Sequence, residues 1–186
     1  MDQILQAIIN GATGEELAAI PLPSTYRAAF VRKQDEKMWD GVPSDQKDPR
    51  KSIHVGEVPM PEIAPDEVVV AVMASSINFN TVWTSIFEPI STFGALARLG
   101  RESSWAKRHD LDYHVVGSDA SGVVLRVGSA VRNWKPGDKI TVPCNHVDDQ
   151  DPSSHSDSMM GSNQRIWGYE TNFGGLADLA VVKANQ

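Results

Sequence analysis

Residues 116–142 constrain the fold of this chain more than any other segment. Two runs, GVVLRVG and DKITV, lie on either side of a turn that contains Pro136, Gly137 and Asp138. The first run is rich in β-branched residues and has Gly122 and Gly128 at its ends. Apolar runs that are bounded by glycines and by a Pro-Gly-Asp turn are typical of strands and not of helices. The segment therefore predicts two neighbouring strands at the corner of a β-barrel.

Three further strands are predicted upstream, at residues 28–31, 53–58 and 67–74. The last of these reads EVVVAVMA, which is sufficiently apolar and β-branched for a strand of the core. Residues 33–51 are polar and predict a loop. The pattern therefore favours a mainly β protein with short helices.

The first residues of the chain predict helix. An apolar stripe runs through residues 2–20, and Thr13 and Glu16 have the spacing of a capping box. We expect residues 1–24 to form a helical arm that packs on a β lobe at residues 25–186. A short helix is also expected between residues 91 and 112.

The composition excludes several classes of protein. A net charge of −7 argues against a nucleic-acid partner, because such proteins carry a basic face. No run of 18 apolar residues is present, which predicts no contact with a membrane, and the N-terminus lacks the pattern of a secretory signal. The single cysteine, Cys144, allows no internal disulfide and fits the reducing cytoplasm.

Two charged clusters are expected to be solvated. One is basic, with contact to phosphates or to a neighbouring subunit as the alternative, and comprises Arg98, Arg101, Lys107, Arg108 and His109. The other is an acidic loop without a calcium-loop pattern and contains Asp148, Asp149, Asp151 and Asp157. Neither cluster predicts a metal site.

The 116–142 segment also resembles a conserved block of the medium-chain dehydrogenase/reductase superfamily, G-x-E-x-x-G-x-V-x-x-V-G followed by G-D-x-V. The matching residues are Gly117, Gly122, Val123, Val127, Gly128, Gly137 and Asp138, with Asp119 at the acidic position. The resemblance implies a GroES-like, partly open β-barrel lobe that precedes a Rossmann lobe. No G-x-G-x-x-G turn follows a strand and opens a helix in this sequence, so we expect the Rossmann lobe to be absent from this chain. The chain would then be a fragment, or one of a pair of chains.

The superfamily's zinc-dependent members carry Cys and His in two segments that have no such residues here. The corresponding segments read SINFNT, at residues 76–81, and Gly117-Ser118-Asp119. Zinc prefers thiolate and imidazole ligands, so we expect no zinc. This places the chain near the zinc-free quinone and enoyl-thioester reductases.

Three longer segments resemble the crotonyl-CoA carboxylase/reductases and their longer-chain 2-enoyl-CoA relatives. They are SSINFNTVWTSIFEP, PCNHVDDQDP and IWGYETNFGGLADLAVVKANQ, and the resemblance covers nearly the whole chain. It implies a reductive carboxylation, in which NADPH delivers hydride to a 2-enoyl-CoA and the resulting enolate attacks CO2 to give an alkylmalonyl-CoA. NADPH would be bound mainly by the absent lobe, so the sequence names no cofactor-binding residues. It also leaves open the acyl-chain length and the choice of NADPH over NADH.

The same resemblance implies a pocket for CO2. Asn80 matches the amide that contacts CO2, and Tyr169 and Glu170 match the pair that completes the pocket, with Glu170 acting through an ordered water and a histidine of the missing lobe. Tyr169 departs from the Phe that is common there. Alternatively, Asn80 caps a helix at residues 81–87, and Glu170 is a surface carboxylate.

Other polar residues are given simpler roles. Asn78 is expected to fix the loop backbone. His54 and His114 are expected to be packed or solvent-exposed histidines and not catalytic ones.

Two rival functions remain open at the level of sequence. One is an enoyl-thioester or quinone reductase that protonates the α-carbon, although residues 83–88 contain no tyrosine to donate the proton. The other is a non-catalytic GroES-like interaction module. A homo-oligomer is expected for the complete enzyme.

The missing phosphate-binding turn gives a prediction for the isolated chain. We expect the 186 residues by themselves to bind no NADPH with useful affinity, because the pyrophosphate has no helix N-terminus to bind. Isothermal titration calorimetry with NADPH measures this, and tight binding would contradict it.

Overall fold

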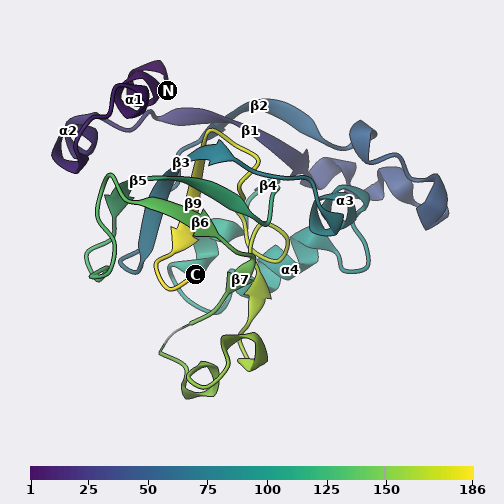
Figure 1. Ribbon diagram of the computed structural model, residues 1–186. Coiled ribbons are helices and arrows are strands. Elements are labelled where there is room, and N and C mark those ends of the chain that lie inside the picture. The colour runs from purple at the N-terminus through teal and green to yellow at the C-terminus, as the bar shows by residue number, and fades with distance from the viewer. Residues whose placement is uncertain (149) are drawn as a thin grey trace.

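The computed structural model describes residues 1–148 and 150–186, and its larger strands form two antiparallel sheets (Figure 1). The strands are β1 (Thr25–Arg32), β2 (His54–Pro59), β3 (Glu67–Ala74), β4 (Tyr113–Val115), β5 (Ala120–Val127), β6 (Lys139–Val142), β7 (Asn145–His146), β8 (Arg165–Ile166) and β9 (Leu179–Lys183). The α-helices are α1 (Asp2–Ile9), α2 (Gly14–Ala19), α3 (Phe79–Ile86) and α4 (Thr92–Leu99). Short 3-10 turns lie at Lys33–Trp39, Ser44–Gln46, Pro49–Lys51, Ala106–His109, Pro152–Ser154 and Ser158–Met160. The prediction of a mainly β protein with short helices is confirmed.

The sheets have the strand orders β2-β1-β4 and β6-β5-β3-β9, and β7 and β8 form a separate pair. All pairings between these strands are antiparallel. The segment before β9 connects the two larger sheets, because Ala177 bridges Ala28 of β1 and the Ala29 N–H donates to the Leu176 carbonyl over 2.8 Å. This connection fits the partly open barrel that the resemblance to the superfamily implies.

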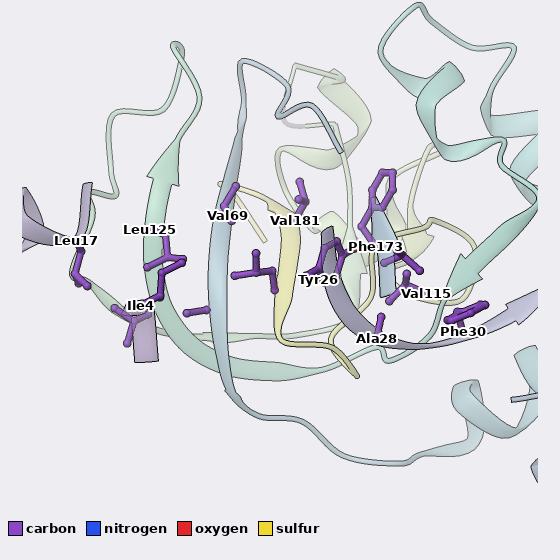
Figure 2. Packing of buried hydrophobic residues seen from close by; sticks show 14 residues of the cluster. Ile4, Leu17, Tyr26, Ala28, Phe30, Val69, Val115, Leu125, Phe173 and Val181 are labelled. Atoms are coloured by element: carbon purple, nitrogen blue, oxygen red, sulfur yellow. The ribbon is translucent and has the colours of Figure 1, made fainter. Parts of the chain in front are cut away.

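Strand β3 is buried on both of its faces. Val69 and Ala71 contribute to the larger hydrophobic core, part of which Figure 2 shows, whereas Val68 and Val70 contribute to a second core with Trp167. Successive side chains of a strand point to opposite faces, so an unbroken valine run can fill two cores at once. The sequence predicted this strand with the bounds that the structure has.

The N-terminal helices pack on the larger core, as the sequence predicts. The capping box is present, because the Glu16 N–H donates to Thr13 Oγ1 over 3.3 Å and the Thr13 N–H donates to Glu16 Oε2 over 2.7 Å. Ile4 and Leu17 are buried in the same cluster as Leu125 of β5 (Figure 2). In Figure 1 these helices lie at one end of the sheets, whereas α3 and α4 lie at the other. The division into domains at residue 24 stays a prediction.

The polar segment at residues 33–51 contains more structure than the loop that the sequence predicts. It contains three 3-10 turns, the first of which ends at Trp39. Trp39 is buried, and its Nε1–H donates to the Ser85 carbonyl of α3 over 3.2 Å. This contact ties the segment to α3, which is the helix that carries Asn80.

The expected solvated face at residues 98–109 is wrong for two of its members. Arg108 forms an ion pair with Glu67 of β3, which is only 2% exposed, and its Nη1–H donates to the Glu62 carbonyl over 2.6 Å. His109 is also buried, and its Nδ1 accepts from the Asn172 N–H over 3.1 Å. A buried carboxylate at the start of β3 requires a cation, and only the tertiary structure brings Arg108 to it.

Among the described residues, no helix has the length and apolar character needed to cross a membrane. Of the acidic loop, Asp151 and Asp157 cap 3-10 turns at Ser153 and Met159, whereas Asp149 lies outside the described residues.

The buried Glu67–Arg108 pair gives a prediction for stability. Burial raises the pKa of Glu67 even with Arg108 beside it, and Arg108→Met would raise that pKa further. We expect the free energy of unfolding to fall by about 3–5 kcal/mol near neutral pH, because one uncompensated charge is left buried. At pH values between the pKa of Glu67 in the unfolded chain and its higher pKa in the folded protein, the folded state binds more protons than the unfolded state. The loss of unfolding free energy caused by Arg108→Met should therefore become smaller as the pH falls toward about 5.

Urea unfolding at several pH values measures both effects. Arg27→Met is the matched control, because Arg27 lies 3.7 Å from Asp178 with its side chain 68% exposed, and it should change stability by less than about 1 kcal/mol. Equal losses in the two variants would contradict the prediction.

Candidate active site

A network of short polar side chains connects the end of β3 and the start of α3 to the residues before β5. Asp119 is its common acceptor. The Ser76 N–H donates to Asp119 Oδ1 over 3.0 Å, Asn78 Nδ2 donates to Asp119 Oδ2 over 2.9 Å, and Ser75 Oγ donates to the Asp119 carbonyl over 2.7 Å. Hydrogen bonds to a carboxylate are stronger than neutral ones, so Asp119 holds the two loops together.

Asn78, and not Asn80, caps α3. Asn78 Oδ1 accepts from the Thr81 N–H over 3.2 Å, and its Nδ2 donates to Ser118 Oγ over 2.7 Å in addition to Asp119. Both the oxygen and the nitrogen of the Asn78 amide therefore form hydrogen bonds. This confirms that Asn78 fixes the loop, and the alternative in which Asn80 caps the helix is wrong.

Asn80 lies in the first turn of α3 and is half-buried. Its Nδ2 donates to Ser118 Oγ over 2.9 Å, which is the only side-chain hydrogen bond of Asn80 within the described residues. One N–H of the amide and its oxygen are thus free to meet a ligand. Ser118 itself is 1% exposed, so the anchor of this amide is shielded from water.

Tyr169 packs against α3 one turn after Asn80. Its ring lies 6.0 Å from that of Trp83, and Trp83 lies 6.0 Å from the exposed ring of Phe79. The Tyr169 hydroxyl is buried and has no hydrogen-bond partner in the part of the chain that the structure describes. Burial raises the pKa of Tyr169, so the phenol stays protonated and uncharged.

Glu170 is half-buried and closes its own turn. Its Oε2 accepts from the Ile166 N–H over 2.8 Å, and the Glu170 N–H donates to the Ile166 carbonyl over 2.7 Å. It also lines a cavity of about 210 Å³ that includes Arg98 and Arg165. No hydrogen bond joins Glu170 to Asn80 among the described residues. Tyr169 contacts Trp83, which lies three residues after Asn80 on α3, and the described hydrogen bond of the Glu170 carboxylate is to the Ile166 N–H.

Two glycines allow the loops that carry Ser118 and Tyr169 to approach each other. Gly168 has φ of +69°, and a Cβ there would lie 1.9 Å from the Gly117 carbonyl oxygen. Gly117 has φ of +110°, and a Cβ there would lie 2.4 Å from the Leu176 nitrogen. Any other residue at these positions would separate the loops.

His114 packs against the loop at Gly168 and has no role in the candidate chemistry. It is fully buried, and its Nε2 lies 2.9 Å from the Gly168 carbonyl oxygen. Burial lowers its pKa to about 4, so the ring is neutral and donates to that carbonyl. The prediction of a packed histidine is confirmed. His54 contacts Asp35 over 2.7 Å, away from the network around Asp119.

The donors of the network do not suit zinc. Amides, hydroxyls and one carboxylate occupy the two segments, whereas zinc prefers thiolate and imidazole. Among the residues that the structure describes, no three or more His, Cys, Asp or Glu side chains are grouped so that they could hold a metal ion. The residues present therefore do not fit the metal.

The sequence pattern does not single out Ser118, whose hydroxyl accepts from both Asn78 and Asn80. At the level of sequence Ser118 belongs only to a segment that lacks zinc ligands. The available signal was its position between Gly117 and Asp119, next to the acidic position of the superfamily block.

Comparisons with known proteins identify the family of the chain. Residues 64–186 match the model of the alcohol dehydrogenase GroES-like domain. The chain is 55% identical to a crotonyl-CoA reductase of Streptomyces avermitilis, over 100% of this chain and 42% of the relative. It is 37% identical to a crotonyl-CoA carboxylase/reductase of Cereibacter sphaeroides, over 75% of this chain and 30% of the relative.

A solved structure is also similar. It is the 2-octenoyl-CoA carboxylase reductase CinF of a Streptomyces species, in complex with NADP and 2-octenoyl-CoA. The TM-score is 0.94 at 56% identity, over 98% of this chain and 41% of that chain. The chain thus spans about 42% of the length of the first curated relative that it matches.

The hydrogen bond between Glu170 and the Ile166 N–H gives a prediction for stability. Glu170→Gln keeps an oxygen that accepts from the Ile166 N–H and should change the free energy of unfolding by less than about 0.5 kcal/mol. Glu170→Leu removes the acceptor and should cost about 1–2 kcal/mol. Urea unfolding midpoints measure this, and equal stability of the two variants would show that the hydrogen bond contributes nothing.

Proposed function

This chain belongs to the alcohol dehydrogenase GroES-like domain family, and we propose that it forms the substrate-binding lobe of an NADPH-dependent reductive carboxylase. Its reaction would convert a 2-enoyl-CoA and CO2 to an alkylmalonyl-CoA. The observation that carries the proposal is the half-buried Asn80 amide, which is held on Ser118 in the segment where zinc-dependent members have metal ligands. The names of the relatives described above, and the ligands of CinF, support the same assignment.

The chemical difficulty of this reaction is competition for the enolate. Hydride addition at the β-carbon leaves an electron pair at the α-carbon, and that pair either forms a bond to the carbon of CO2 or takes a proton. When it attacks CO2, one C–O π pair moves to oxygen and gives a carboxylate. CO2 is dilute and weakly polar, so the site must hold it close to the α-carbon and exclude free water.

Asn80 is suited to hold CO2. Its free amide N–H can donate to a CO2 oxygen, and an amide does not readily give up a proton to the enolate. The N-terminus of α3 adds partial positive charge beside the place where the carboxylate would form. Both effects favour carboxylation over protonation.

The buried ring of Tyr169, with the partly exposed ring of Trp83 beside it, would exclude water on one side of this position. Tyr169 is 4% exposed, and its raised pKa makes it a weaker acid than an ordinary phenol. In the proposal Glu170 acts through an ordered water, using the carboxylate oxygen that the Ile166 N–H does not occupy.

The cofactor would be held outside this chain. The strands of the described residues pair antiparallel, and these residues contain no strand–glycine turn–helix unit that could bind a pyrophosphate. A reduced nicotinamide bound by a separate nucleotide-binding lobe would supply the hydride. The proposal further includes a zinc-free site, a homo-oligomeric enzyme and a place in the cytoplasm, for which the unpaired Cys144 is the support.

Asn80→Leu tests the proposal in the full-length protein, meaning this chain with its nucleotide-binding lobe. The variant should keep much of the hydride transfer and divert the enolate to protonation. Loss of one donor should lower the ratio of alkylmalonyl-CoA to saturated acyl-CoA by about 5- to 150-fold, from ~1–3 kcal/mol. The ratio is measured by mass spectrometry of the products at saturating bicarbonate.

Asn145→Leu is the matched control, because Asn145 Nδ2 makes a similar 2.8 Å bond to Ser158 Oγ outside the network around Asp119. It should leave the ratio unchanged. If Asn80→Leu slows both products equally, Asn80 does not hold CO2. If the unchanged protein yields only saturated acyl-CoA with bicarbonate present, the reductase function is the correct one.

A further inference from the structure

We propose that Ser118 is a positioning residue that fixes the orientation of the Asn80 amide toward CO2. The inference rests on the proposed function, because it assigns Ser118 a part in the same reaction. Ser118 would touch neither CO2 nor the enolate, and would act only through Asn80.

The hydroxyl of Ser118 is shared by two amides. Its Oγ accepts from Asn78 Nδ2 over 2.7 Å and from Asn80 Nδ2 over 2.9 Å. A serine oxygen has two acceptor positions, so these two bonds use both of them. Because Ser118 is 1% exposed, water does not compete for either position.

Asn78 is held independently of Ser118, whereas Asn80 is not. Asn78 also bonds Asp119 Oδ2 and the Thr81 N–H, so three partners determine its orientation. Asn80 has only the bond to Ser118 among the side chains of the described residues. Removing the hydroxyl should therefore release Asn80 and leave Asn78 in place.

The backbone at Ser118 is itself fixed. The Gly175 N–H donates to the Gly117 carbonyl over 2.9 Å, and Gly117 has the positive φ that this crossing requires. A rigid acceptor sets the direction of the remaining Asn80 N–H before the substrates bind. Preorganised donors of this kind stabilise a developing charge without reorganisation during the reaction. If the amide rotated, its oxygen could face CO2 instead, and the donor would be lost.

Ser118→Ala in the full-length protein tests this role. The ratio of alkylmalonyl-CoA to saturated acyl-CoA should fall by about two- to tenfold, with total NADPH oxidation changed less than about twofold. In an Asn80→Leu background, Ser118→Ala should cause no further fall in the ratio, because the two residues act as one unit.

Ser52→Ala is the matched control. Ser52 is as deeply buried as Ser118 and donates to the Ser85 carbonyl of the same helix, α3, over 2.5 Å. It should lower stability without changing the ratio. If Ser118→Ala does not fold, Ser118→Cys replaces the hydroxyl with a weak acceptor and should change the ratio in the same direction.

A second measurement does not depend on the reaction. With isotope-labelled asparagine, NMR reports hydrogen exchange of the Asn80 side-chain amide, whose signal is assigned by its loss in Asn80→Leu. Exchange should be several-fold faster in Ser118→Ala than in Ser52→Ala. If the protein makes no carboxylated product, the proposed function fails, and this measurement alone decides whether Ser118 orients Asn80.

Four results would overturn the inference. They are an unchanged product ratio in Ser118→Ala, an equal fall in Ser52→Ala, an equally large further fall in the Asn80→Leu background, and an Asn80 amide signal that does not respond to Ser118→Ala.

Discussion

The burial of β3 on both faces is the constraint on which the rest of the structure depends. Val68 and Val70 pack in one core, and Val69 and Ala71 pack in the other, while β5 and β9 occupy both edges of the strand. A strand in this position has no freedom to slip, because a shift by one residue would exchange the two faces. Its C-terminal end is therefore a fixed point from which the Ser75–Asn78 loop starts.

The hydrogen-bond network at this end of β3 holds the side chains that start from its rigid backbone. Asp119 accepts from the loop after β3, and Ser118 accepts from the two asparagines at the start of α3. The hydroxyls and amides are short and have few rotamers, so holding them costs little conformational entropy. The proposed reaction needs this rigidity, because the Asn80 amide must be held in place if it is to favour CO2 over a proton.

At the opposite end of β3 the same strand begins with a buried carboxylate. Glu67 also accepts from the Ala64 N–H over 3.0 Å, and its ion pair with Arg108 connects the segment after α4 to the barrel. Arg108 additionally lies over the ring of Phe173, with its guanidinium carbon 5.4 Å from the ring centroid. Arg108 and His109, which belong to a segment expected to be a polar surface, are thus part of the packing that supports the Asn172–Phe173 turn.

The sequence by itself determined the features that depend on near neighbours. The valine run fixed β3, the spacing of Thr13 and Glu16 fixed the capping box, and the lack of thiols and imidazoles at residues 76–81 argued against zinc. The tertiary structure decided the partners of polar side chains: Asn80 meets Ser118 across 38 positions, and Glu67 meets Arg108 across 41. Local patterns specify a strand or a cap through contacts a few residues apart. Which distant hydroxyl or guanidinium meets a given side chain depends on strand order and on close backbone crossings such as Gly117 with Gly168, which no local pattern encodes.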